Sequence, residues 1–193
     1  ASREWEGINS FYTSISSNSY IKEAYTSNYK AIYLANQLLE KIDEKGTIIT
    51  NTTDRATMVA EARFLRAFYY YHVVDLFGQA AYRPAGSDIL ADPLVWSRAE
   101  ATDYIISELE AIVSALPARV ANDASLANKD AAHFLLAKIY LNKGVFKAAD
   151  PAGPYTFDAA DMTKVVQHVD ALTTTLSSAY WDNFAPTNNT SSE

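Results

Sequence analysis

The chain contains no cysteine among its 193 residues. A disulfide framework, a thiolate nucleophile and a cysteine-based metal site are therefore excluded. Glycine and proline are also scarce, with six of each, whereas hydrophobic residues make up 49% of the chain. This composition is typical of a folded, helix-rich protein and argues against disorder.

Basic residues are in the minority, and long apolar runs are missing. The 16 Lys and Arg residues against 23 Asp and Glu residues give a formal net charge of -7. This acidity disfavours nucleic acid and anionic lipid as partners, because both require a basic face. No apolar run approaches the ~20 residues that a membrane-spanning helix needs. The first residues read like the middle of a longer sequence, so we expect that the native N-terminus precedes them.

Aromatic residues are abundant, with 13 Tyr, 8 Phe and 3 Trp. Tyr has an apolar ring and a polar hydroxyl, which suits it both to packing between helices and to binding ligands. We expect most of these rings to pack between helices.

Apolar residues recur at three- and four-residue steps in five stretches, which predicts five helices. The predicted helices cover about residues 21–45, 54–77, 98–116, 129–144 and 158–176. Asp54 is expected to cap the second helix, Gly78 to end it in a left-handed conformation, and Ser97 with Glu100 to form a capping box. Residues 1–21 and 79–96 are predicted to be irregular.

The second predicted helix is apolar on nearly every side, so other elements must cover it. Its Arg63 and Arg66 are interpreted as internal ties to carboxylates on neighbouring helices, since buried ions persist only when paired. Asn36 lies in the apolar stripe of the first helix. It is interpreted as an inter-helix hydrogen-bonding residue.

A repeated pattern relates the second helix to the fourth. The pattern Ala-x-Phe-Leu-x-Ala-x-x-Tyr occurs at residues 62–70 and again at 132–140. It predicts an all-α fold of stacked helical hairpins, similar to tetratricopeptide packing, with long irregular loops. The usual tetratricopeptide period of about 34 residues is not kept. The last predicted helix, 158–176, lacks a partner, so we expect the chain to be part of a longer protein.

No motif in the chain indicates catalysis, a metal or a cofactor. His72, His133 and His168 fall in three different helices, and only His72 has a carboxylate, Asp75, at a metal-ligand spacing on its own face. We interpret that pair as a hydrogen bond. A carboxylate pair for glycoside hydrolysis stays open, since acidic residues occur in the predicted loops. These residues are Glu4, Glu6, Asp88 and Asp92.

Residues 60–78 resemble the signature of the SusD/RagB family of nutrient-binding outer-membrane lipoproteins. Residues 29–42, 96–117, 131–141 and 180–193 resemble the flanking segments of that family in the same order, so the resemblance covers essentially the whole chain. It implies an all-helical tetratricopeptide-like scaffold that captures oligosaccharides, or peptides in one branch, without catalysis.

The same resemblance implies a partner and a location. The partner is a SusC-like TonB-dependent transporter that receives the ligand, and the location is the cell surface of the outer membrane. The signal peptide, the lipidated cysteine and the C-terminal half of the family are not in this sequence. Residues 1–193 are therefore expected to form one SusD-like helical domain, as a fragment of the family's full length.

Sugar recognition requires exposed aromatic faces beside Asn, Arg or Asp side chains that bind hydroxyl groups. The N-terminal segment offers this mixture and occupies a position where the family often contacts ligand. The candidate glycan-binding residues are Arg3, Trp5, Asn9, Tyr12 and Tyr20. The second choices are Tyr82 and Trp96 in the long segment.

Two other functions remain open from the sequence. One is a tetratricopeptide adaptor whose groove binds a protein segment, and the other is an all-helical carbohydrate-active enzyme. Titration with oligosaccharides and peptides separates the first from glycan binding, and release of reducing ends from polysaccharides would establish the second.

Overall fold

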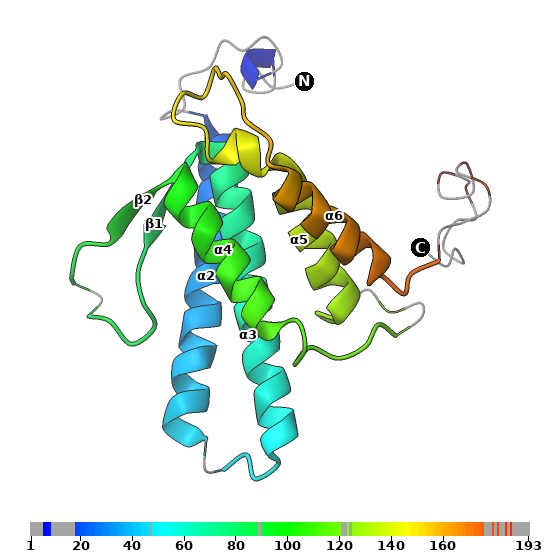
Figure 1. Cartoon of the computed structure of the whole chain (residues 1–193). Helices are drawn as coiled ribbons and strands as arrows, with labels where there is room; N and C mark the ends of the chain where they lie inside the picture. Colours follow the sequence, from blue (N-terminus) through cyan, green and yellow to red (C-terminus); the bar gives the residue numbers. More distant parts are fainter. Residues whose placement is uncertain are drawn as a thin grey trace.

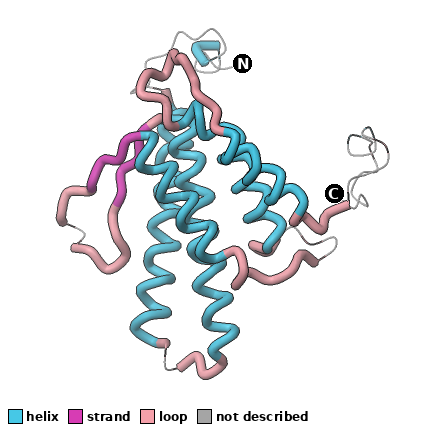
Figure 2. The backbone as a smooth tube through the Cα atoms, in the orientation of Figure 1, coloured by secondary structure: helices cyan, strands magenta, loops and turns pink. Residues whose placement is uncertain are grey.

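The computed structural model describes residues 6–8, 18–46, 48–88, 90–120, 123, 125–175, 179, 181, 184 and 186. A helical turn occupies residues 6–8. The longer helices are α2 (Ser19–Lys45), α3 (Thr52–Phe77), α4 (Arg98–Ile112), α5 (Lys129–Phe146) and α6 (Ala159–Asp170), and the strands are β1 (Gln79–Tyr82) and β2 (Leu94–Ser97). The chain is predominantly helical, as predicted (Figure 2). None of the described helices has both the length and the apolar character needed to cross a bilayer.

The helices form a stack in chain order. Figure 1 shows α2 and α3 as a long hairpin, α4 across its front, α5 and α6 together on one side, and the two strands on the other. Each helix contacts the next one along the chain, and α3 also contacts α5. This arrangement confirms the predicted stack of tetratricopeptide-like hairpins.

The repeated pattern marks the positions where the helices pack most closely. Ala62, Ala67 and Tyr70 of α3 are buried, and so are the corresponding Ala and Tyr residues of α5. The pattern fails at its Phe position, because Phe64 is buried whereas Phe134 is 61% exposed. The Leu position differs in the opposite sense, since Leu65 is 43% exposed whereas Leu135 is buried. At these two positions the helices therefore turn different faces to their neighbours.

The ends of α3 confirm one sequence prediction and correct another. Gly78 has a φ of +71° and closes the helix in the left-handed region, as expected. The N-cap is Asn51 and not Asp54, because the Asn51 Oδ1 accepts hydrogen bonds from the amides of Thr53 and Asp54. Asn and Asp are almost equal as N-caps, so composition alone could not choose between them.

The segment 79–96 contains a two-stranded antiparallel ribbon, so its prediction as fully irregular was wrong. β1 and β2 pair with Ala80 opposite Trp96 and Tyr82 opposite Leu94. Strands of four residues are too short to show a clear alternation in the sequence. The ribbon leads into the predicted capping box, in which Ser97 and Glu100 bond reciprocally at the start of α4.

The last two helices differ from their predicted bounds. α5 does not end at Gly144 but continues to Phe146. A Cβ at position 144 would overlap the carbonyl oxygen of Thr156 in the following loop. Gly144 therefore leaves room for this loop to pass over the helix. α6 ends at Asp170, before the predicted end, and none of its residues is buried.

A buried polar network ties α2, α3 and α4 together. The Glu108 carboxylate accepts hydrogen bonds from Arg63 at 2.7 and 3.1 Å and from Arg66 at 2.6 Å. Arg66 also donates to Asn36 Oδ1 at 2.9 Å, and the Asn36 amide donates to the carbonyl of Arg83 beyond β1 at 3.2 Å. Both predictions are confirmed: the two arginines are internal ties, and Asn36 joins separate elements.

Candidate functional site

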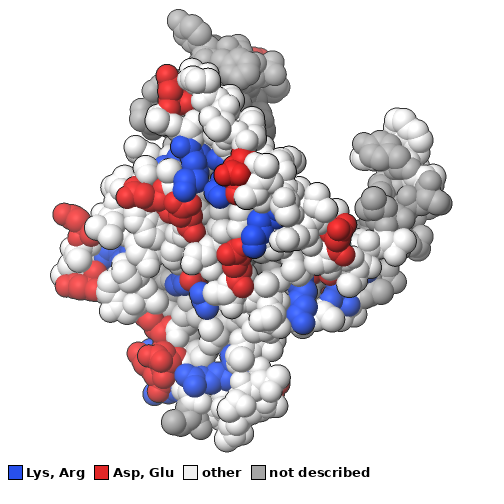
Figure 3. All heavy atoms as spheres, in the orientation of Figure 1, with Lys and Arg blue, Asp and Glu red and all other residues white. Residues whose placement is uncertain are grey.

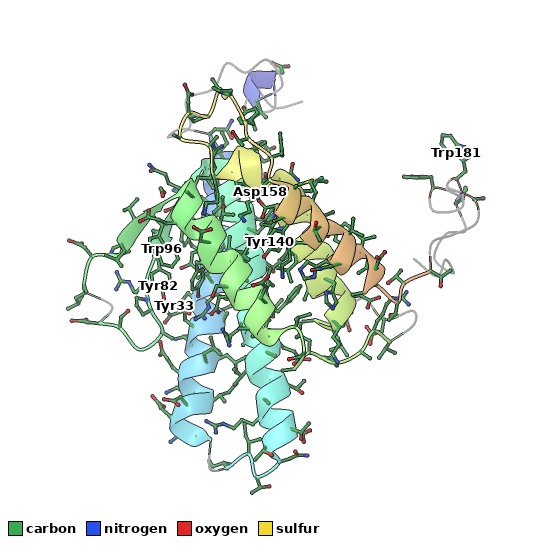
Figure 4. All side chains as sticks on the ribbon, viewed as in Figure 1. Tyr33, Tyr82, Trp96, Tyr140, Asp158 and Trp181 are labelled. Atoms are coloured by element: carbon green, nitrogen blue, oxygen red, sulfur yellow. The ribbon has the colours of Figure 1, made fainter. Side chains whose placement is uncertain are left out.

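The ribbon presents a stacked aromatic pair. The rings of Tyr82 and Trp96 lie 3.7 Å apart between centroids, with 14° between their planes. Since Trp96 is opposite Ala80, the two rings form a diagonal pair across the strands. Both side chains are half-buried and pack against the core. The two second-choice residues from the sequence are thus brought together on one surface (Figure 4).

Beneath this pair lie two more tyrosines. The Tyr104 ring is 4.8 Å from Trp96 and 5.3 Å from Tyr82, and the Tyr70 ring is 5.7 Å from Tyr104. Burial raises the pKa of both Tyr70 and Tyr104 above the usual tyrosine value. The Tyr104 hydroxyl is buried and finds no hydrogen-bond partner among the described residues. The inner layer therefore supports the outer pair and stays neutral at physiological pH.

The ribbon is fixed to one stripe of α2. The Tyr29 hydroxyl accepts a hydrogen bond from the amide of Ala81 at 2.7 Å, and burial raises the pKa of Tyr29 to about 12. Glu40 Oε1 accepts from the amide of Gly86 at 2.6 Å. Because Tyr33 lies one turn after Tyr29, its side chain shares this stripe.

Tyr33 is the most exposed ring on this stripe. Its side chain is 49% exposed, and its hydroxyl accepts a hydrogen bond from Gln37 at 2.6 Å. In the view of Figure 4 it projects on the same side of the molecule as the ribbon and Tyr82. The exposed ring offers a face on which an apolar sugar face can stack.

Arg83, which follows Tyr82 in the chain, supplies a cation to the loop between the strands. Its guanidinium donates to the carbonyl oxygen of Asp88 at 2.8 Å and to that of Ala91, which orders the loop between the strands. Within the described residues Arg83 forms no ion pair. A guanidinium carries five N–H donors, so these two bonds leave others for a ligand. We call Tyr33, Tyr82, Arg83 and Trp96 the ribbon surface.

The first-choice glycan-binding residues from the sequence analysis are not part of the ribbon surface. Arg3, Trp5, Asn9 and Tyr12 lie outside the described residues. Tyr20 is the second residue of α2, where its amide donates to the N-cap Asn18 at 3.1 Å, and its side chain is half-buried. Their role as glycan-binding residues therefore stays a prediction.

Sequence reasoning missed Tyr33, Arg83 and a histidine pair. Tyr33 lies three residues before Asn36, on the same face of the helix. This spacing indicates Tyr33 only after the structure has shown that Asn36 contacts the end of the ribbon. His133 and His168 fall in two different predicted helices, yet their Nδ1 atoms lie 3.0 Å apart. Their separation of 35 residues gives no local signal.

The described residues offer few other sites. They contain no group of three or more His, Cys, Asp or Glu residues able to hold a metal ion. A shallow, largely apolar groove of about 340 Å³ lies between the first half of α3 and the end of α4. On the face shown in Figure 3, basic and acidic residues are interspersed rather than segregated into a basic patch.

Comparison with known proteins identifies the class of protein. The profile of a SusD-like family, described as starch-binding and associating with the outer membrane, matches residues 1–141. The chain therefore belongs to the SusD-like family. The starch-binding protein SusD of Bacteroides thetaiotaomicron is 37% identical over 87 residues, which are 45% of this chain and 15% of that protein.

Solved structures support the same fold. A crystal structure described as being with xylogluco-oligosaccharide matches with a TM-score of 0.71 and 22% identity, over 89% of this chain and 34% of the other. The surface glycan-binding protein A of Bacteroides uniformis matches with a TM-score of 0.68 and 18% identity, over 89% and 36%. A SusD-like protein of Bacteroides fragilis gives 0.67 and 19%, over 89% and 32%. The chain thus spans about a third of the length of these structures.

Proposed function

We propose that this chain is the helical part of a surface glycan-binding protein that captures oligosaccharides without cleaving them. Membership of a family described as starch-binding is the observation that carries this proposal. The ribbon surface supports it, because an exposed ring, a stacked aromatic pair and an arginine are the groups that bind sugar faces and hydroxyls.

The proposal includes a location and a partner. The protein acts at the outer membrane as a surface lipoprotein, a location that the family description supports. It passes its ligand to a SusC-like TonB-dependent transporter. Co-purification of that transporter with the tagged full-length protein from outer membranes tests this step, and its failure under conditions that retain glycan binding would remove the transporter from the proposal.

Isothermal titration with a panel of oligosaccharides tests the binding itself. We expect Tyr33→Ala to weaken binding of the oligosaccharide that binds the unmodified protein by about fivefold, since stacking on an aromatic ring contributes roughly 1 kcal/mol. The matched control is Tyr155→Ala, because Tyr155 is 42% exposed but lies in the loop after α5. It should leave the affinity unchanged.

The N-terminal candidates form a second arm of the same experiment. If Trp5→Ala and Tyr12→Ala abolish binding while Tyr33→Ala does not, the site lies in the N-terminal segment and not at the ribbon surface. Peptide binding without saccharide binding would favour the adaptor function. Release of reducing ends from a polysaccharide would contradict a purely binding role.

A further inference from the structure

Two histidines from different helices meet where α6 lies against α5. The Nδ1 atoms of His133 and His168 are 3.0 Å apart, and the ring centroids are separated by 5.3 Å. The Tyr140 ring stacks on His168 with 17° between the planes and 5.8 Å between centroids. Both imidazoles are half-buried. The contact is thus a defined imidazole–imidazole hydrogen bond.

This hydrogen bond requires the accepting Nδ1 to be unprotonated. One Nδ1 donates its proton, and the other accepts it through a lone pair. A proton added to the accepting nitrogen would bring two N–H groups together and place a positive charge beside the partner ring. If the pair gained one proton and kept the bond, the Nε2 of His168 would carry a proton whichever ring donates, and that atom is buried without a hydrogen-bond partner among the described residues.

The surrounding charges do not remove this conflict. On α6, Lys164 lies close enough to His168 to disfavour a second positive charge, while Glu110 on α4 has the opposite effect. The Glu110 carboxylate already accepts the Tyr140 hydroxyl at 2.6 Å and lies 3.7 Å from the Lys164 ammonium. Burial, His133 and Lys164 together lower the pKa of His168 below the usual histidine value.

Other contacts also hold α6 and the residues after it to α5. Lys143 of α5 pairs with Asp161 of α6 at 2.6 Å. Asp130 of α5 accepts three hydrogen bonds from Thr173 and Thr174, after the end of α6. Burial acts to raise the pKa of Asp130, but these bonds lower it overall, so this carboxylate stays ionised at pH 5.

Little of the surface of α6 is covered. None of its residues is buried, and its Val166 and Val169 are 58% and 50% exposed. We propose that the His133–His168 pair is a pH-sensitive clasp that holds α6 on α5 near neutral pH and loosens it in mild acid. The rest of the helical stack does not depend on this pair.

The sign of the effect follows from linkage. Because the folded-state pKa of His168 lies below its unfolded value, an opened α6 binds more protons than a docked one. The contribution of the pair is fully present above the ordinary histidine pKa of about 6.5. It decreases as the pH falls through that value toward the lower folded pKa.

Amide hydrogen exchange tests the clasp directly. The exchange of the α6 amides is measured at pH 7.5 and pH 5.0. The rates are expressed as protection factors, because this removes the intrinsic pH dependence of exchange. We expect protection in α6 to fall by up to about thirtyfold at pH 5.0, which is the limit that an ordinary histidine pKa of about 6.5 sets for one such group. Protection in the centre of α3 should not change.

Two variants assign the effect to the pair. His133→Gln should reduce the pH response of α6 to about threefold or less, because a neutral side chain then faces His168. The matched control is His72→Gln, which removes a half-buried histidine of α3 whose ring packs on Phe68 at 4.5 Å. It should retain the full pH response of α6.

Three results would overturn the proposal. The first is equal protection of α6 at both pH values in the unmodified protein, which requires no variant. The second is an undiminished pH response in His133→Gln. The third is a response that disappears when EDTA is added, since a bound metal ion would then explain it.

Discussion

Replacing Glu108 by Gln tests the physical reasoning about the core most directly. Its carboxylate is 12% exposed and joins two arginines that are 28% and 10% exposed. Gln keeps the shape but removes the charge, and it leaves the guanidinium of Arg66 buried without a counter-ion. Removing one partner of a buried ion pair costs about 3–5 kcal/mol. We expect a loss of roughly 3 kcal/mol in the free energy of unfolding.

Urea denaturation followed by circular dichroism at pH 7 measures this loss. With a slope of about 2 kcal/mol per molar urea, the unfolding midpoint should fall by about 1.5 M. Glu110→Gln is the matched control on the same helix. Glu110 is 40% exposed and its ion pair is 3.7 Å long, so that change should cost less than about 1 kcal/mol.

The pH dependence provides a second check of the same residue. Burial acts to raise the pKa of Glu108, but the hydrogen bonds from Arg63 and Arg66 lower it overall. Its contribution to stability is therefore present above the unfolded pKa and is lost as the pH falls through the lower folded value. The difference between the unmodified protein and Glu108→Gln should shrink below about pH 4. If Glu108→Gln is as stable as Glu110→Gln at pH 7, the buried network does not stabilise the fold as argued.

Two further substitutions test local features by the same denaturation assay. Gly144→Ala should destabilise the protein even though Ala favours a helix by about 1 kcal/mol, because the added Cβ would overlap the Thr156 carbonyl oxygen; a gain in stability would show that the loop does not pack there. Asn36→Ala should cost about 1–3 kcal/mol, since it removes the partners of Arg66 and of the Arg83 carbonyl; an unchanged midpoint would mean that water replaces both bonds.

The helices were largely predictable from the sequence because their signals are local. Apolar spacing located all five, the Ala and Tyr repeat indicated which faces pack, and Gly78 and the Ser97–Glu100 capping box marked helix ends. The arginines of α3 were recognised as internal ties because an apolar helix cannot leave them unpaired. Their common partner, Glu108, could not be named, since 45 and 42 residues separate it from Arg63 and Arg66.

The candidate surface was only half predictable. Tyr82 and Trp96 were selected by residue type, but their stacking depends on a strand register that four-residue strands do not reveal. Tyr33 joined them only because neighbouring residues on α2 bind the ribbon.

By itself, the sequence determined the helical class, the hairpin repeat and the resemblance to the SusD-like family, because these depend on periodicities and motifs within single segments. Only the tertiary structure decided which distant side chains meet: Glu108 with two arginines, Tyr82 with Trp96, and His133 with His168. Such contacts depend on how whole helices and strands are placed against one another. No spacing along the chain specifies that placement.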